Sequence, residues 1–177
     1  RLTIALAKEH LKELPAAQPV KFFEVTNKSR MNFKSTHVTF FHTTHSIPDS
    51  LGIVFHTSEG AIVHTGEFKF DQAAKGSYRP DIAKMAGLGE EGVFILMSDS
   101  TEAERPGYTT SESVVEEHLS ETFHGAKGRI LVSLYSSNFI RIQQVFDTAI
   151  ESRRKVAVVG KTLETVFEVG KRLDYLQ

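Results

Sequence analysis

The sequence contains no cysteine, which excludes disulfide bonds and thiolate metal sites. Any metal ion must therefore be held by histidine nitrogen or by carboxylate oxygen. The absence of cysteine also fits a reducing cytoplasm, which is the compartment that we expect for this protein.

Long apolar runs and an excess of charge are missing too. No apolar run approaches the roughly 20 residues of a membrane-spanning helix, and no signal-peptide pattern opens the chain, so we expect no membrane partner. The formal net charge is −1, from 21 Lys and Arg against 22 Asp and Glu. This balance does not favour nucleic-acid binding, and a nucleic-acid partner would require local basic patches or a metal ion. A short basic run, Arg153-Arg154-Lys155, is more often a solvated face than a phosphate clamp.

What is present is the composition of an ordinary globular protein. Hydrophobic residues make up 40 % and charged residues 24 % of the 177 residues, which suits one domain or parts of two. The chain begins with Arg1 rather than methionine, and residues 1–14 already show helical spacing. We therefore expect an internal piece of a longer protein.

The first half of the chain predicts a helix followed by short strands. Leucines at helical spacing predict the helix over residues 1–14, and Pro15 and Pro19 are expected to end it. A polar turn is predicted at residues 27–30. Strands are predicted over residues 20–26, 37–42, 52–56 and 61–64. Their short connections favour a mixed or antiparallel sheet.

The second half alternates between strands and helices. Buried apolar strands are predicted over residues 92–97, 129–134 and 155–159. Helices are predicted over residues 81–88, 111–123, 140–152 and 162–173. This alternation indicates a parallel sheet with crossover helices, and the change in rhythm places a boundary near Pro106. The predicted fold class is therefore α/β.

Two short segments carry the candidate chemistry, and each follows an apolar strand. The first, residues 42–50, reads HTTHSIPDS, and the second, residues 64–71, reads HTGEFKFD. A histidine and a carboxylate on neighbouring strands can meet at one metal ion. The plainer alternative stays open at this point, because a lone histidine at a strand end is usually a packing or surface residue and a lone glutamate in a turn is usually solvated.

Four strings, in order along nearly the whole chain, resemble the bacterial ribonuclease J family, in the β-CASP branch of the metallo-β-lactamase superfamily. They read HSIPDSLGIVFHTSEGAIVHTGEFKFD, SDSTEAERPGYTTSE, GRILVSLYSSNFIRIQQV and KVAVVGKTLE. The resemblance implies the C-terminal portion of an αββα metallo-β-lactamase core over residues 1–106. It implies the start of a Rossmann-like β-CASP domain over residues 107–177. A core sheet that lacks its first strands exposes unpaired edges, which favours association.

The resemblance also implies roles for individual positions. His45 matches a terminal metal ligand, and Glu67 stands where the family has an aspartate that bridges two zinc ions. Asp99 matches the acidic residue of the first β-CASP motif, close to the catalytic centre. Ser137 and Asn138 match a Ser-Asn step that the family places near bound RNA.

This sequence departs from the family pattern in three respects. Glu67 is one methylene longer than aspartate, about 1.5 Å of extra reach, whereas metal–ligand distances tolerate only about 0.2 Å. Ile140 stands where the family usually has a histidine, two residues after Asn138. The HxHxDH signature, which supplies most of the family's zinc ligands, does not occur in these 177 residues. We expect that signature to lie upstream of Arg1, whereas the replacements at Glu67 and Ile140 resemble the family's second, weakly active paralogue.

Two functional hypotheses follow from the resemblance. In the first, the protein is an RNA-processing subunit that assembles with a paralogous ribonuclease J, as a homo- or hetero-oligomer, and has little activity of its own. In the second, it is an active zinc-dependent ribonuclease that cleaves RNA internally and from the 5′ end. We favour the first, because the departures at Glu67 and Ile140 erode the site. Under either hypothesis we expect the isolated chain to be inactive.

Overall fold

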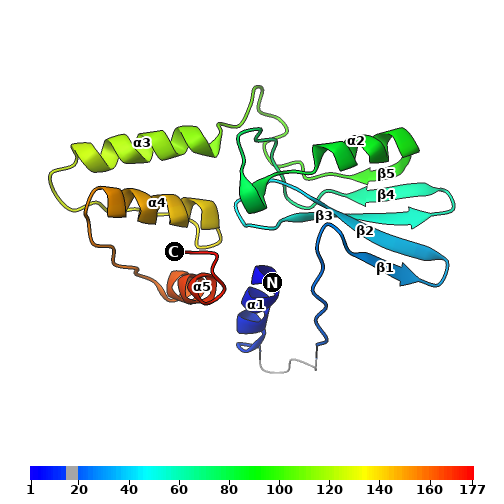
Figure 1. The fold of residues 1–177 in the computed structure, drawn as a ribbon, viewed down its shortest axis with the longest axis horizontal. Helices are drawn as coiled ribbons and strands as arrows, with labels where there is room; N and C mark the ends of the chain where they lie inside the picture. Colours follow the sequence, from blue (N-terminus) through cyan, green and yellow to red (C-terminus); the bar gives the residue numbers. More distant parts are fainter. Residues whose placement is uncertain (15–19) are drawn as a thin grey trace. The chain divides into compact units, whose positions relative to one another are not determined.

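The computed structural model describes residues 1–14 and 20–177, which form two compact units (Figure 1). The sheet unit comprises Val25–Glu112, and the helical unit comprises Arg1–Glu24 together with Ser113–Gln177. A five-stranded sheet and several helices confirm the predicted α/β class. The predicted boundary near Pro106 concerns family domains, and it stays a prediction.

The sheet unit contains a sheet in the order β1-β2-β3-β4-β5. Its strands are β1 (Arg30–Phe33), β2 (Thr36–His42), β3 (Leu51–Thr57), β4 (Gly60–His64) and β5 (Val93–Met97). The first four strands pair antiparallel, whereas β5 pairs parallel to β4 after the crossover helix α2 (Ile82–Glu91). Strands β2, β4 and β5 therefore run in the same direction, and their carboxyl ends lie at one edge of the sheet.

Helix α2 lies against the sheet (Figure 1), and the core of this unit lies between them. Leu88 of α2 belongs to one buried cluster with Phe41, Val54, Ala61 and Val63. Ala61 and Val63 are two residues apart on β4, so they share one face of the strand. The period-two alternation that predicts these strands thus also selects the buried face.

Gly52 on β3 faces the buried ring of Phe41 so closely that an added Cβ would overlap the ring. We expect Gly52→Ala to lower the free energy of unfolding by about 1–3 kcal/mol, because overpacking a dense core displaces side chains from their rotamers. The matched control is Gly87→Ala in α2, where nothing lies within 4 Å of an added Cβ. That change should be neutral or stabilising, by up to about 1 kcal/mol. Equal melting temperatures for the two variants would contradict this packing.

The helical unit is built from α1 (Leu2–Leu11), α3, α4 (Phe139–Glu151) and α5 (Lys161–Arg172). Helix α3 spans Glu112–Gly125, so its first residue belongs to the sheet unit. Phe123, Val145 and Ala149 form a buried cluster, against which Ile130 and Leu134 pack. Within residues 1–14 and 20–177, no helix has both the length and the apolar character needed to cross a membrane.

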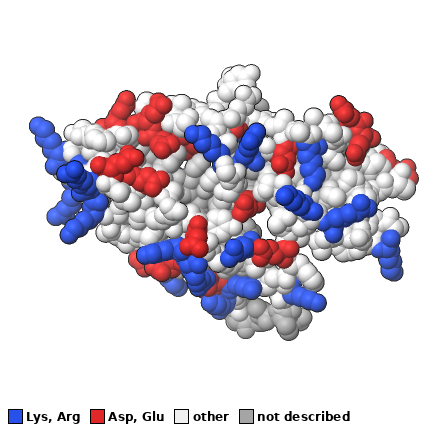
Figure 2. All heavy atoms as spheres, in the orientation of Figure 1, with Lys and Arg blue, Asp and Glu red and all other residues white. Residues whose placement is uncertain are grey.

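Arg154, the middle residue of the basic run, serves the helical unit itself. Its guanidinium donates hydrogen bonds to the carbonyl oxygens of Phe123, Ala126 and Gly128 at the C-terminal end of α3. Cationic side chains favour this end of a helix, where carbonyl groups lack partners within the helix. Arg153 and Lys155 are exposed, as a solvated face requires. In Figure 2, basic side chains gather at the left, where Figure 1 places the C-terminal ends of α3 and α4.

Two predictions about the first half are wrong or incomplete. Residues 20–26 do not form a strand, because they have no backbone partner in the described sheet. Strand β1 forms instead, beginning at Arg30, the last residue of the predicted turn, and pairs with β2. The helix α1 ends earlier than predicted, at Leu11. Pro15 and Pro19, which are predicted to end that helix, lie outside the described residues.

The two strands predicted in the second half at residues 129–134 and 155–159 are also absent. Both segments contain no helix, turn or bend. Neither segment pairs with another strand in the described part of the chain. A strand exists only through such hydrogen bonds to a neighbour, so extended chain alone does not make one.

Strand β5 forms as predicted, but it is not buried. All five of its residues are exposed, and Phe94 and Leu96 are each more than half exposed. In the described sheet, β5 is an edge strand with only β4 beside it. Its outer edge therefore has no partner among the described residues.

Candidate catalytic and metal-binding site

Three of the predicted site residues meet at the carboxyl edge of the sheet. His45 follows β2, Glu67 follows β4 and Asp99 follows β5, so their loops leave the sheet from the same edge. His45 Nε2 lies 3.5 Å from Glu67 Oε2. The N–H of Phe68, the residue after Glu67, lies 3.5 Å from Asp99 Oδ2. The structure thus brings the side chains of His45 and Glu67 together and places Asp99 next to the segment that carries Glu67.

The loop that carries His45 is held by hydrogen bonds on both sides of the histidine. The Thr43 N–H donates to the Ser50 carbonyl at 2.9 Å, and the Thr43 hydroxyl donates to the Ser50 hydroxyl at 3.0 Å. Thr44 is buried, and its hydroxyl donates to the carbonyl oxygen of Tyr78 at 2.8 Å. The fixed backbone of Thr43 and Thr44 therefore sets the position from which His45 projects.

The loop that carries Glu67 begins with a glycine that its geometry requires. Gly66 has a φ of +65°, and a Cβ there would lie 3.1 Å from a carbonyl oxygen of β3. Beyond it, the Lys69 N–H donates to the Thr44 carbonyl at 2.8 Å, which places Glu67 beside His45. The Glu67 side chain is 77 % exposed, so solvent screens its interaction with His45.

Asp99 is an ionised carboxylate held by its own loop. The Thr101 N–H and hydroxyl donate to Asp99 Oδ1 at 2.9 and 2.7 Å, and the Asp99 N–H donates to the buried Thr65 hydroxyl at 3.1 Å. The two hydrogen bonds from Thr101 lower the pKa of Asp99 most, and the N–H of Phe68 and the charge of His45 lower it further. The carboxylate is therefore available as an acceptor or as an ion near His45 and Glu67.

Asp71 is a buried carboxylate that sequence reasoning did not single out. It accepts hydrogen bonds from the Ser111 hydroxyl at 2.9 and 3.0 Å, from the Glu112 N–H at 3.0 Å and from the Ala73 N–H at 3.0 Å. Burial alone would raise the pKa of Asp71, but these hydrogen bonds and the charge of Lys69 hold it below its ordinary value. Asp71 is therefore a buried anion whose charge is stabilised by donors.

Lys69 extends this network towards the site. Its Nζ lies 2.7 Å from Glu112 Oε1 and 3.8 Å from Asp71 Oδ2, and its backbone N–H is bound to Thr44. The segment that carries Glu67 is thus held to Glu112 as well as to the His45 loop. The sequence predicts the start of a helix at Ser111 but not its contact with Asp71, because the two residues are 40 positions apart.

Ser137 and Asn138 lie in the helical unit, immediately before α4. Asn138 is the N-cap residue of α4, and its side-chain oxygen accepts a hydrogen bond from the Arg141 N–H at 3.1 Å. This cap is a sufficient structural reason for an asparagine there. Ser137 is exposed and Ile140 is half-buried. A contact of Ser137 and Asn138 with RNA stays a prediction.

His45 and Glu67 could supply two ligands to a zinc ion. Ligand atoms about 2.1 Å from a tetrahedral ion lie roughly 3.4 Å from each other, and the two side-chain atoms are 3.5 Å apart. Zinc sites use three or four protein ligands, however. No group of three or more histidine or carboxylate residues able to hold a metal occurs in residues 1–14 and 20–177. The described residues therefore do not fit a zinc site of their own.

We accordingly expect the 177-residue chain to bind zinc weakly or not at all, because two ligands leave the ion mostly hydrated. The measurement is metal analysis after dialysis, with His45→Ala as the control variant. Both proteins should retain the same low background of zinc. One tightly held zinc ion per chain, lost in His45→Ala, would contradict the expectation.

Comparison with known proteins identifies the class and then the family. A family model described as Ribonuclease J, beta-CASP domain matches residues 127–177, which assigns this part of the α/β chain to the β-CASP class of the metallo-β-lactamase superfamily. Ribonuclease J 2 of Staphylococcus aureus strain NCTC 8325 / PS 47 is 54 % identical over 99 % of this chain. Ribonuclease J 2 of Staphylococcus saprophyticus is 55 % identical over the same share. The chain belongs to the ribonuclease J family.

The chain spans 31 % of the length of these curated relatives. The resemblance stated from the sequence is confirmed, including the likeness to a second paralogue, which the names of both relatives express. The roles of individual site residues are a separate question and stay predictions.

Proposed function

We propose that the full-length protein acts in RNA processing and decay as a subunit of a ribonuclease J complex, with weak or absent activity of its own. The observation that carries the proposal is Glu67. It stands where the family has a bridging aspartate, and its side chain is 77 % exposed beside His45. A longer side chain at a bridging position loosens or abolishes the bridge, since metal ligands tolerate about 0.2 Å of error.

The state of the surrounding scaffold supports the same proposal. Hydrogen bonds hold the buried Asp71, the loop of Asp99 and the hydroxyl of Thr44. At the predicted RNA-binding residues Ser137 and Asn138, the Asn138 side chain still caps α4. Ile140, in contrast, stands where the family usually has a histidine. A sound scaffold with altered chemistry is what we expect of a structural or regulatory subunit.

The alternative is an active zinc-dependent ribonuclease that cleaves RNA internally and from the 5′ end. It is favoured by the meeting of His45, Glu67 and the ionised Asp99 at one edge of the sheet. It is also favoured by the relatives, whose names describe ribonucleases. The two readings differ in whether Glu67 is an adequate ligand.

Domain assignment, partners and compartment complete the proposal. Residues 1–106 would be the C-terminal portion of the metallo-β-lactamase core, and residues 107–177 the start of the β-CASP domain. The family match at residues 127–177 falls within the second range. RNA would contact Ser137 and Asn138, a paralogous ribonuclease J would be the protein partner, and the cytoplasm would be the compartment.

The variant Glu67→Asp in the full-length protein separates the two readings. If the protein carries an intact HxHxDH signature, aspartate restores the shorter reach of the family's ligand, and we expect cleavage of 5′-labelled RNA to rise at least about tenfold, a gain of roughly 1.4 kcal/mol. Glu59→Asp, in the exposed turn between β3 and β4, is the matched control and should change nothing. Equal, substantial activity of Glu67→Asp and the unaltered protein would favour the enzyme.

A further inference from the structure

Two histidines lie directly opposite each other in the sheet unit. His37 of β2 and His56 of β3 are partners in the register of these antiparallel strands. Their imidazole rings are stacked, with centroids 4.2 Å apart and ring planes 6° from parallel. His37 lies near the amino end of β2, whereas His45 follows the carboxyl end of that strand, so the two histidines lie away from the candidate site. We call His37 and His56 the histidine pair.

The histidine pair lies on the face of the sheet that packs against α2. Side chains alternate along β2, so His37 and Thr39 share a face with Phe41, which belongs to the buried cluster beneath α2. The partner of His56 on β4 is Ala61, a member of the same cluster. The Thr39 hydroxyl lies 2.8 Å from His56 Nε2. Both histidines are half-buried, so they are partly desolvated but remain within reach of protons from solvent.

The groups around the histidine pair disfavour its protonation. Burial lowers the pKa of His56 most, and a charge on His37 lowers it next. The carboxylate of Glu91, the last residue of α2, raises this pKa, whereas the cations Arg30 of β1 and Lys84 of α2 lower it. The Lys84 ammonium is held in place, because it donates hydrogen bonds to two backbone carbonyl groups. Glu91 can therefore offset one added proton, but a second proton meets repulsion from β1, β2 and α2.

A second proton would place two positive charges on the stacked rings. Like charges directly opposite each other on paired strands are destabilising. Their repulsion is stronger at a half-buried position than in water, because the surroundings screen it less. The strand register fixes the two backbone positions, so the rings can separate only by turning out of the packed face or by loosening the strands. Double protonation is therefore incompatible with the native packing at this end of the sheet.

We infer that the histidine pair is a proton-sensitive switch, which stabilises the packing of β2, β3 and α2 while at most one ring is charged and weakens it when both are. The ordinary pKa of histidine is 6.5. A histidine with a lower pKa in the folded protein contributes stability that is complete above about pH 6.5 and is lost as the pH falls through the folded value. Mild acid would thus loosen the sheet that carries the candidate site while Asp71 and Asp99 stay ionised. This inference is independent of whether the protein cleaves RNA.

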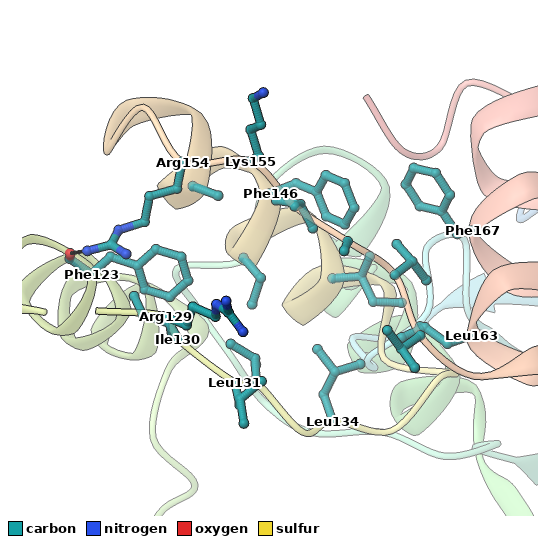
Figure 3. A pocket seen from close by; sticks show the side chains of 18 of the residues that line it. Phe123, Arg129, Ile130, Leu131, Leu134, Phe146, Arg154, Lys155, Leu163 and Phe167 are labelled. Atoms are coloured by element: carbon teal, nitrogen blue, oxygen red, sulfur yellow. Dashed lines mark hydrogen bonds between the residues drawn. The ribbon is translucent and has the colours of Figure 1, made fainter. Parts of the chain in front are cut away.

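Nuclear magnetic resonance of the imidazole C–H groups tests the switch in the unaltered 177-residue chain. Between about pH 8 and 5, the two rings of the histidine pair should titrate in separate steps, and the second step should fall at least about one pH unit below 6.5. Phe146 and Phe167, which line an apolar hollow of the helical unit (Figure 3), are the internal reference. No histidine is among the described residues that line this hollow, so their signals should not shift. Titration of both rings in one step at or above pH 6.5 would overturn the inference.

The effect on stability is tested with His37→Phe, which keeps a flat ring over His56 but cannot take a proton. From about pH 7.5 to 5.5, the equilibrium constant for unfolding in urea should rise roughly tenfold more in the unaltered chain than in this variant. His118→Phe, on the exposed surface of α3, is the matched control and should follow the unaltered chain.

His56→Gln is the second variant, because it keeps a polar side chain near Thr39 and also cannot be charged. It should flatten the pH dependence in the same way as His37→Phe. Circular dichroism checks that each variant is folded, and the titration of the unaltered chain decides if neither is. A pH dependence in the folded variants equal to that of the unaltered chain would show that the histidine pair is not a switch.

Discussion

Asp71→Ala is expected to lower the free energy of unfolding of the sheet unit by about 3 kcal/mol. The Asp71 carboxylate is 6 % exposed and accepts hydrogen bonds from Ser111, Glu112 and Ala73. Alanine would leave the three donors without this acceptor and would leave Lys69 without one of its two carboxylate neighbours. Urea unfolding followed by circular dichroism measures the loss.

The matched control is Glu90→Ala at the exposed end of α2, which removes one carboxylate and should change stability by less than about 0.5 kcal/mol. Asp71→Asn keeps an acceptor and the side-chain volume, so its loss should be smaller than that of alanine. A loss for Asp71→Ala no larger than that for Glu90→Ala would show that the network contributes nothing.

The pH dependence of the same variants gives an independent check. The pKa of Asp71 lies below its ordinary value of 3.8 in the folded protein. A lowered pKa contributes stability that is complete above the unfolded value and is lost as the pH falls through the folded value. The stability difference between the unaltered chain and Asp71→Asn should therefore be constant near neutral pH and narrow below about pH 4. A difference that widens in acid would contradict the role of the ionised carboxylate.

Periodicity was enough to predict the elements whose partners are close in sequence. Strands β2, β3 and β4 are joined by short turns, so alternation along each strand also fixes its neighbour. Helix α4 makes its own hydrogen bonds, and its apolar residues Ile142, Val145 and Ala149 are buried. Residues 129–134 and 155–159 carry the same aliphatic signal as a buried strand, but a strand also needs a distant partner, which no local pattern specifies.

Some residues of the candidate site could be singled out from the sequence, and others could not. His45, Glu67 and Asp99 could be predicted because each follows an apolar strand and each lies in a string that resembles the family. The topology then explains their meeting, since β2, β4 and β5 run in the same direction. Asp71 could not be predicted, because its partners lie about 40 positions further along the chain and a loop carboxylate is usually solvated.

Assembly with a second ribonuclease J is the prediction with the largest functional effect. The resemblance sets Glu67 and Ile140 apart from the family pattern, whereas hydrogen bonds hold the loops of Asp71 and Asp99. We therefore expect this protein to act mainly by binding another protein. We expect it to raise or redirect the RNA cleavage of its partner while contributing little cleavage itself.

The central claim is tested most directly by mixing the full-length protein with a paralogous active ribonuclease J at micromolar concentration. Size-exclusion chromatography of each protein alone and of the mixture is followed by cleavage of 5′-labelled RNA with each fraction. We expect a common peak in the mixture and a rate or product pattern that differs from the sum of the separate proteins. If the two proteins elute independently and the mixture cleaves RNA only as the sum of its parts, the subunit hypothesis is wrong. The hypothesis of an active zinc-dependent ribonuclease then replaces it.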